Sequence, residues 1–301
     1  MLKYFPSKLR GNIMVKYHKI IVFLLSTLFT ISAYAQESKL DFSSIVNSFM
    51  QKNNQLNEIT NRAGKQRMLT QRMTKLSLLI SLDIKRKKNI KKLKKASKTY
   101  ADNLAKLQSK NPKITQQLQI IEKLWKPFYK NINNVIQNNE KDTSINYLVE
   151  HNKELLQNSD KLVKLFATSD SHLNYLDKAK LTIVNLAGRQ RMLLEKMSKE
   201  KILILKKNKR YASQLKNSMN TFDMTLKKLK VGDKSQKILG VTNPKLINKL
   251  KVIEPLWEKL KPLYAKEEID KKELSKLIRQ SSLLLLESNI YVKLTELERE
   301  Y

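Results

Sequence analysis

Hydrophobic residues recur along most of the chain at intervals of three and four. Leu69, Met73, Leu76 and Ile80 follow this spacing, which places them on one face of a helix. The chain has only five Gly and six Pro among its 301 residues. Sandwiches, barrels and Rossmann folds need turn residues at frequent intervals, so these classes are excluded. The pattern therefore predicts an all-α protein.

Helix start signals divide the chain into two similar series of helices. Pro112 and Pro244 each follow an Asn, and Asn before a Pro is typical of the first turn of a helix. Pro127, Pro255 and Pro262 lie further along the same helices, which we expect them to kink or shorten. The expected helices cover about 42–85, 89–108, 112 onward and 142–167, then about 169–207, 209–230, 244–266 and 270–300.

An internal repeat accounts for the two series. Residues 61–75 (NRAGKQRMLTQRMTK) and 185–199 (NLAGRQRMLLEKMSK) share nine of fifteen residues at an offset of 124. Trp125 and Trp257 form a second matching pair, at an offset of 132, so the second copy has gained residues, which we assign to the turn-rich stretch 231–240. The duplication predicts two tandem antiparallel four-helix bundles, residues 36–168 and 169–301.

The N-terminal residues have the pattern of a secretory signal. A basic segment is followed by the apolar run 20–31 and by Ala33-Tyr34-Ala35, a small-x-small cleavage site. The run is shorter than the roughly 20 residues that a membrane-spanning helix needs, so an uncleaved anchor is the less favoured alternative. We therefore expect residues 1–35 to be a cleaved signal peptide and the mature chain to be a soluble periplasmic protein.

Composition narrows the classes of function. The formal net charge of +33, from 60 Lys and Arg against 27 Asp and Glu, suggests nucleic acid, but export would separate the chain from that partner. The absence of Cys excludes disulfides, thiolate zinc sites and iron–sulfur clusters, and the three His are far apart. No nucleophile–base pair or phosphate loop is visible. We expect neither an enzyme nor a bound metal or cofactor.

The repeated motif has two buried faces. On a helical wheel, Ala63, Gly64 and Arg67 lie opposite the apolar stripe, as do Ala187, Gly188 and Arg191 in the second copy. A Gly within a helix costs about 1 kcal/mol relative to Ala, and small residues allow another backbone to approach closely. Half of the ten Arg of the chain lie in these two windows, namely Arg62, Arg67, Arg72, Arg189 and Arg191.

If the two motif helices cross, Arg67 and Arg191 converge. Two like charges in a partly desolvated gap repel unless an anion lies between them, and planar guanidiniums suit a small planar oxyanion. The alternative is that the motif is only a packing device, with its Arg in ordinary salt bridges. The motif Met are expected to fill the core rather than to act as ligands, namely Met68, Met73, Met192 and Met197.

The pattern N-x-A-G-[KR]-Q-R-M-L-x-x-[KR]-M, present twice, resembles the N-terminal sensory domain of type IV pilus methyl-accepting chemotaxis transducers, the PilJ-type domain. That family is related to the periplasmic domain of nitrate/nitrite sensor kinases, in which the corresponding Arg binds nitrate at a symmetric subunit contact. The resemblance implies that the anion-binding residues are Arg67 and Arg191, with Gly64 and Gly188 giving close approach and Asn61 and Asn185 as further candidates. The nitrate sensors lack the Lys-Gln and Arg-Gln pairs that follow the Gly here.

These inferences predict a periplasmic sensor or binding protein for a small oxyanion, with nitrate or nitrite favoured. Its expected partner is a membrane-bound histidine kinase or chemoreceptor. The two motif helices would face each other within one chain, or each would pair with its equivalent in a homodimer. The alternative function is a ligand-independent periplasmic helical adaptor or structural protein associated with a signalling or pilus system.

Overall fold

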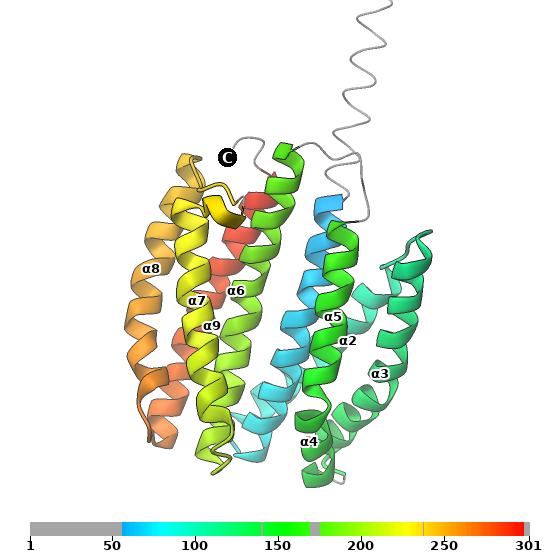
Figure 1. Cartoon of the computed structure of the whole chain (residues 1–301). Coiled ribbons are helices and arrows are strands. Elements are labelled where there is room, and N and C mark those ends of the chain that lie inside the picture. The colour runs from blue at the N-terminus through cyan, green and yellow to red at the C-terminus, as the bar shows by residue number, and fades with distance from the viewer. Residues whose placement is uncertain (1–55, 140, 169–174, 237, 298–301) are drawn as a thin grey trace, which may run out of the picture. The chain divides into compact units, whose positions relative to one another are not determined.

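The computed structural model describes residues 56–139, 141–168, 175–236 and 238–297, all of which belong to one compact unit, residues 54–301 (Figure 1). The expected signal peptide, residues 1–35, and the expected start of the first helix lie outside the described residues. So do most of the residues at the expected boundary between the two domains, 168/169. These three assignments stay predictions.

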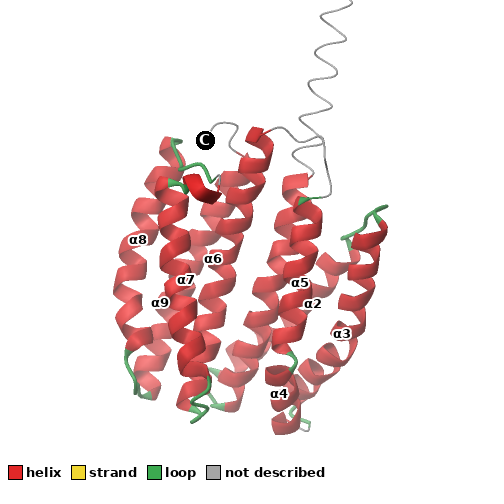
Figure 2. Ribbon diagram, in the orientation of Figure 1, coloured by secondary structure: helices red, strands yellow, loops and turns green. Residues whose placement is uncertain are grey.

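The described residues are helical with short connections (Figure 2). In the first repeat, the helix of residues 56–81 carries the motif. It is followed by α2 (Arg86–Ala105), α3 (Pro112–Gln137), α4 (Lys141–Glu150) and α5 (Asn152–Ala167). In the second repeat the motif lies on α6 (Tyr175–Leu205), followed by α7 (Tyr211–Val231), a 3-10 turn η1 (Lys234–Gln236), α8 (Pro244–Ala265) and α9 (Lys271–Leu297). Strands are absent from the described part, so the all-α prediction is confirmed.

The predicted helix starts at the two Asn-Pro pairs are confirmed. The side chain of Asn111 caps α3 by accepting a hydrogen bond from the backbone N of Lys113, and Asn243 caps α8 in the same way. The expected fourth helix of the first repeat differs from the structure, because a one-residue turn at His151 divides it into α4 and α5.

The expectation that internal prolines shorten the third helices is wrong. Helix α3 continues past Pro127, and α8 continues past both Pro255 and Pro262. All three prolines are exposed, so water can satisfy the carbonyl groups that lose a helical partner. The opposite faces of these helices are held in the core by Trp125 and Trp257.

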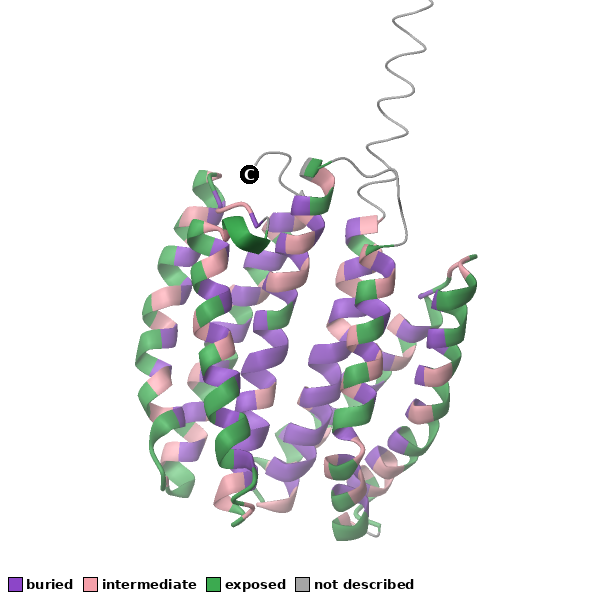
Figure 3. Cartoon of the chain, viewed as in Figure 1, coloured by how far each residue is buried: buried purple, intermediate pink, exposed green. Residues whose placement is uncertain are grey.

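The two repeats share one apolar core. In the second repeat α6 packs against α7 and α9, and α8 packs against α9 and α7; in the first, α3 packs against α2, α4 and α5. Buried apolar residues from both repeats form a single cluster. The motif helix 56–81 and α6 are buried on most of their surface (Figure 3). The antiparallel order within each predicted bundle stays a prediction.

The longer connection of the second repeat lies where the repeat comparison placed the additional residues. Helices α7 and α8 are joined by residues 232–243, whereas α2 and α3 are joined by residues 106–111. Gly232 has a φ of 79°, and a Cβ at this position would lie 2.6 Å from the backbone N of Gly240. Only Gly fits such a close approach of two backbone segments.

Candidate functional site at the contact between the repeats

The same contacts position the motif helix in both repeats. Gln66 donates a hydrogen bond from Nε2 to the carbonyl oxygen of Tyr100 on α2, at 3.0 Å, and the ring of Tyr100 lies 4.2 Å from that of Trp125. Gln190 makes the same bond to the carbonyl oxygen of Phe222, whose ring lies 4.3 Å from that of the second Trp. Both Gln are buried, so each motif helix is fixed to its own repeat by the same contacts.

Arg67 joins the first motif helix to the second repeat. Its side chain is 2% exposed. Nη1 donates to Oδ1 of Asp160 on α5 at 2.7 Å, and Nη2 donates to Oδ1 of Asn185 on α6 at 2.8 Å. One guanidinium therefore contacts a carboxylate of its own repeat and the Asn that opens the other motif.

Arg191 makes the reciprocal contact. Its side chain is 4% exposed, and Nη2 donates to Oδ1 of Asn61 at 2.5 Å. Nη1 donates to Oδ1 of Asn289 on α9 at 3.3 Å. The two motifs thus exchange equivalent Arg–Asn hydrogen bonds, and the motif helices face each other within one chain.

The motif glycines provide the space in which the guanidiniums lie. A Cβ added to Gly64 would lie 3.3 Å from Nη2 of Arg67. A Cβ added to Gly188 would lie 3.5 Å from Nη2 of Arg191 and 3.6 Å from Nη2 of Arg67. Both guanidiniums therefore approach the same point on α6. The predicted convergence of the two Arg beside the small residues agrees with this geometry.

The two guanidiniums differ in how their charge is balanced. Arg67 is paired with the carboxylate of Asp160. Burial raises the pKa of Asp160, but the positive charge of Arg67 outweighs this effect and lowers the pKa overall. At the corresponding place beside Arg191 stands the neutral amide of Asn289. Burial lowers the pKa of Arg191 to about 10, opposed by Glu296 and reinforced by Arg67. Burial also raises the pKa of Glu296 itself, which weakens its value as a counter-charge.

Each of these Arg retains an unused donor. In the part of the chain that the structure describes, Nε of Arg67 and Nε of Arg191 are buried and have no hydrogen-bond partner. A buried N–H without a partner costs about 1–3 kcal/mol, so these two groups are the strongest unmet demand for an acceptor at the contact. An oxyanion would satisfy that demand.

A second pair of ionic positions lies further along the motifs. Glu195 on α6 accepts from Nε of Arg72 at 2.7 Å and forms an ion pair with Lys75. Burial raises the pKa of Glu195, but these two cations outweigh it and lower the pKa to about 2. The repeat-related positions are Gln71 and Lys199. Gln71 is fully buried with neither amide atom hydrogen-bonded, and burial lowers the pKa of Lys199 to about 8.

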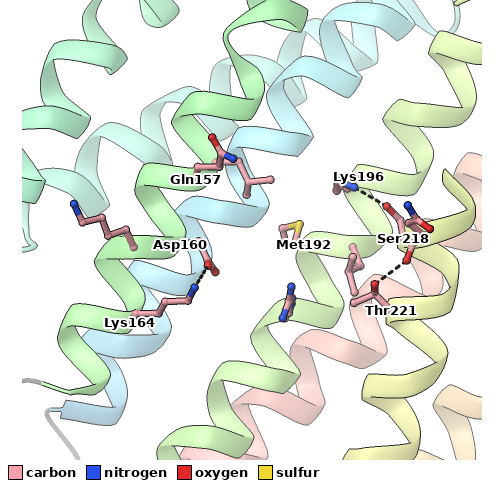
Figure 4. A pocket seen from close by; sticks show the side chains of 12 residues that line it. Gln157, Asp160, Lys164, Met192, Lys196, Ser218 and Thr221 are labelled. Atoms are coloured by element: carbon pink, nitrogen blue, oxygen red, sulfur yellow. Dashed lines mark hydrogen bonds and ion pairs between the residues drawn. The ribbon is translucent and has the colours of Figure 1, made fainter. Parts of the chain in front are cut away.

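A groove of about 610 Å³ opens beside the Arg67–Asp160 pair, between α5, α6 and α7 (Figure 4). Asp160 and Lys164 on α5 lie on one wall, and Met192 and Lys196 on α6 lie on another. Oδ2 of Asp160 lies 3.2 Å from Nζ of Lys164. This groove is the route by which solvent reaches the carboxylate that neutralises Arg67.

The structure brings together all six residues that the sequence singled out. These are Asn61, Gly64, Arg67, Asn185, Gly188 and Arg191. Their proposed role in binding an anion is untested by this geometry. Sequence reasoning missed Asp160 and Asn289, whose signal was a shorter repeat shared by residues 155–165 and 284–294, and it missed the anchoring Gln66 and Gln190, whose signal was their identity in both copies. The motif Met are buried, in agreement with a core role.

The described ranges contain neither a metal-binding cluster nor a membrane-spanning helix. There, no three His, Asp or Glu side chains are grouped so that they could hold a metal ion. None of the helices in those ranges combines the length and the apolar character of a membrane span.

Comparison with known proteins identifies one family. The family model described as the N-terminal part of type IV pili methyl-accepting chemotaxis transducers, PilJ, matches residues 49–150 and 173–280. The two matched segments each contain one copy of the motif. Comparison with curated proteins and with solved structures gives no match.

Proposed function

Because the chain belongs to the family of type IV pili chemotaxis transducer N-terminal domains, we propose that it is a non-catalytic sensory protein that binds one small oxyanion at the contact between its repeats. Arg67 and Arg191 are the ligand-binding pair, and nitrate or nitrite is the favoured ligand. Gly64 and Gly188 allow the two guanidiniums to approach each other, and Asn61 and Asn185 hold the guanidiniums until the anion arrives.

The observation that carries this proposal is the imbalance of charge around Arg191. Its guanidinium is almost fully buried and donates hydrogen bonds to amide oxygens. The carboxyl group that opposes its charge is that of Glu296, whose pKa is raised, and Nε of Arg191 has no partner among the described residues. A buried cation without a carboxylate partner is unfavourable, and a monovalent anion would relieve the cost. Arg191 is therefore the primary contact, and Arg67 is the second.

The proposed location rests on the N-terminal sequence pattern, and the proposed signalling role rests on the family. A signal peptide of residues 1–35 would deliver the mature chain to the periplasm, where small oxyanions enter freely. The receiving partner would be a membrane-bound chemoreceptor or histidine kinase. Binding would change how tightly the two repeats are held together, because Arg67 and Arg191 already link them, and the partner would respond to that change.

The proposal is tested by calorimetric titration of the mature chain with nitrate, nitrite and sulfate. We expect one nitrate or nitrite per chain, and weaker binding of sulfate, because its second charge exceeds the single uncompensated cation. Arg191→Gln should abolish binding, whereas Arg189→Gln, an exposed neighbour in the same motif, should leave it intact. Absence of binding to the wild-type chain, or equal binding by Arg191→Gln, would refute the proposal.

A second candidate function is favoured by the contacts of Arg67. This guanidinium already has a carboxylate and an amide oxygen as partners, as expected if the motif only fastens the repeats together in a ligand-independent adaptor. If the chain is such an adaptor, Arg67→Ala should lower the free energy of unfolding. Adding an oxyanion should leave the free energy of unfolding of the wild-type chain unchanged. Thermal denaturation with and without about 10 mM nitrate, which would saturate a micromolar site, separates the two functions.

A further inference from the structure

A second groove lies on the opposite side of the contact between the repeats. It has a volume of about 370 Å³ and is formed by the helix 56–81, α2 and α9. The groove beside Asp160 is formed by the repeat-equivalent helices. Helix α6 corresponds to the helix 56–81, α7 corresponds to α2, and α5 corresponds to α9. We call the two grooves the α9 groove and the α5 groove. The internal duplication has therefore produced two equivalent grooves, which can be compared position by position.

Cations dominate one wall of the α9 groove. They are Lys65, Arg72, Lys75, Lys92 and Lys95, and the only acidic residue among the lining residues is Glu195. Glu195 is fully engaged by Arg72 and Lys75. Among the described residues, no hydrogen bond or ion pair is formed by the side chains of the three remaining Lys. Burial and neighbouring cations lower the pKa of Lys65 and of Lys92, and outweigh the opposing effects of Glu296 on Lys65 and of Glu195 on Lys92.

Apolar side chains form much of the remaining lining of the α9 groove. They come from leucines of the motif helix and from residues of α9, namely Leu69, Leu76, Leu79, Ile278, Leu285 and Leu286. Leu286 is 55% exposed, although its neighbour Leu285 is buried. Leu286 therefore offers an exposed apolar surface beside the three Lys.

Three positions differ between the two grooves in a way that favours a bound anion with an apolar body. The carboxylate of Asp160 is replaced by the amide of Asn289, and the polar Gln157 is replaced by Leu286. On the remaining wall, Asn217 is replaced by Lys95. At these three positions an acid is lost, and a cation and an apolar side chain are gained. The lining of the α9 groove carries five cations and one acid, against four cations and one acid in the α5 groove.

We propose that the α9 groove binds an amphiphilic organic anion, with its charged group against Lys65, Lys92 and Lys95 and its apolar body against Leu286 and the leucines of the motif helix. A volume of about 370 Å³ lies at the small end of the range of ligand sites, which suits one anionic group with an apolar body of about a dozen heavy atoms. This site is separate from the Arg67–Arg191 pair and does not depend on oxyanion binding there.

The test uses decanoate and decyl phosphate below their micellar concentrations, with decanol and inorganic phosphate as the probes that lack the charge or the apolar body. We expect calorimetry to give one molecule of decanoate or decyl phosphate per chain. Decanol and inorganic phosphate should each bind at least about tenfold more weakly, because each satisfies only one wall.

Variants assign the binding to the groove. The double variant Lys92→Gln/Lys95→Asn and the single variant Leu286→Gln should each weaken decanoate binding at least about tenfold. The matched control Lys161→Gln/Arg189→Gln removes the same charge from the exposed lining of the α5 groove and should leave the affinity within twofold. All these positions except Leu286 carry exposed polar side chains, so the variants should fold.

Three results would overturn the proposal: no binding of either amphiphile to the wild-type chain, an unchanged affinity in the α9-groove variants, or an equal loss in the α5-groove control. The last result would indicate a general attraction of anions to a basic protein. Circular dichroism on every variant shows that a lost signal does not arise from unfolding.

Discussion

Oδ1 of Asn185 lies 2.8 Å from Nη2 of Arg67, across the contact between the two repeats. The same bond in reverse joins Arg191 to Asn61 at 2.5 Å. Each motif therefore supplies one donor and one acceptor to the other, as two subunits would at a twofold interface. The duplication has placed that interface inside one chain, where its two halves can differ.

The first prediction concerns the different partners of the two Arg, a carboxylate beside Arg67 and an amide beside Arg191. Asn289→Asp places a carboxylate beside Arg191, as Asp160 already does beside Arg67. We expect the free energy of unfolding to rise by about 1–3 kcal/mol, because a buried cation gains a charged partner. Nitrate affinity should fall at least about tenfold, because the new carboxylate competes with the anion.

Urea denaturation and calorimetry measure the two effects. Asp160→Asn is the reciprocal variant: it should lower stability and should not weaken nitrate binding. If Asn289→Asp binds nitrate as well as the wild-type chain, the anion does not contact Arg191.

The second prediction concerns the missing carboxylate beside Lys199. Gln71 is the repeat equivalent of Glu195, the partner of Lys75, and among the described residues its amide has no hydrogen-bond partner. Lys199, the repeat equivalent of Lys75, donates to Oδ1 of Asn152 and not to a carboxylate. Gln71→Glu should raise the pKa of Lys199 and increase the free energy of unfolding at pH 7 by about 1 kcal/mol, since the buried ammonium already pays for its desolvation.

The matched control is Glu195→Gln, which converts the complete pair into a copy of the incomplete one. It should lower stability by about 3–5 kcal/mol, because Lys75 and Arg72 then lose their buried carboxylate. Thermal unfolding measures both variants. A loss of stability in Gln71→Glu would show that the two positions are not equivalent.

The third prediction is a pH dependence of stability. Burial lowers the pKa of Lys199 to about 8 in the folded chain, whereas the ordinary value is 10.5. Between these two values the unfolded chain binds more protons than the folded one, so this group makes the free energy of unfolding rise with pH. The rise from Lys199 is at most about 3 kcal/mol.

Lys199→Met removes this contribution. Urea denaturation between pH 7 and pH 10 should give a flatter profile for the variant than for the wild-type chain, with the largest difference in slope above pH 8. Parallel profiles for the two proteins would contradict the lowered pKa. Lys196→Met serves as a control, because that Lys is paired with Glu200 at 2.7 Å.

The fourth prediction concerns the space at Gly188. An Ala Cβ there would lie 3.5–3.6 Å from the two guanidiniums, which is ordinary contact, and Ala favours helix by up to about 1 kcal/mol. Gly188→Ala should therefore change stability by less than about 1 kcal/mol. Gly188→Leu should destabilise the chain by about 1–3 kcal/mol, because its side chain displaces Arg67 and Arg191.

Chemical denaturation of the two variants checks this. The same comparison at Gly64, where a Cβ would lie 3.3 Å from Nη2 of Arg67, should show a larger cost for Ala. Equal stability of Gly188→Leu and wild type would mean that the guanidiniums can lie elsewhere.

The sequence by itself determined the helices, the repeat and the residues that meet at its centre. These depend on local patterns, since apolar periodicity sets the buried face of a helix and Asn-Pro sets its start. The buried Ala-Gly and Arg of each motif were therefore identifiable without coordinates. That α3 and α8 would keep their length past Pro127, Pro255 and Pro262 was not predicted, because the exposure of these Pro depends on packing.

Only the tertiary structure decided which partners the two Arg have. Asp160 and Asn289 lie 93 and 98 residues from the guanidiniums that they contact, on helices whose sequence similarity does not say what they pack against. Periodicity places such residues on a helix face but does not say which distant helix packs against it. The same packing decided that the motifs pair within one chain and that one of the two equivalent grooves gathers unpaired Lys beside exposed Leu286.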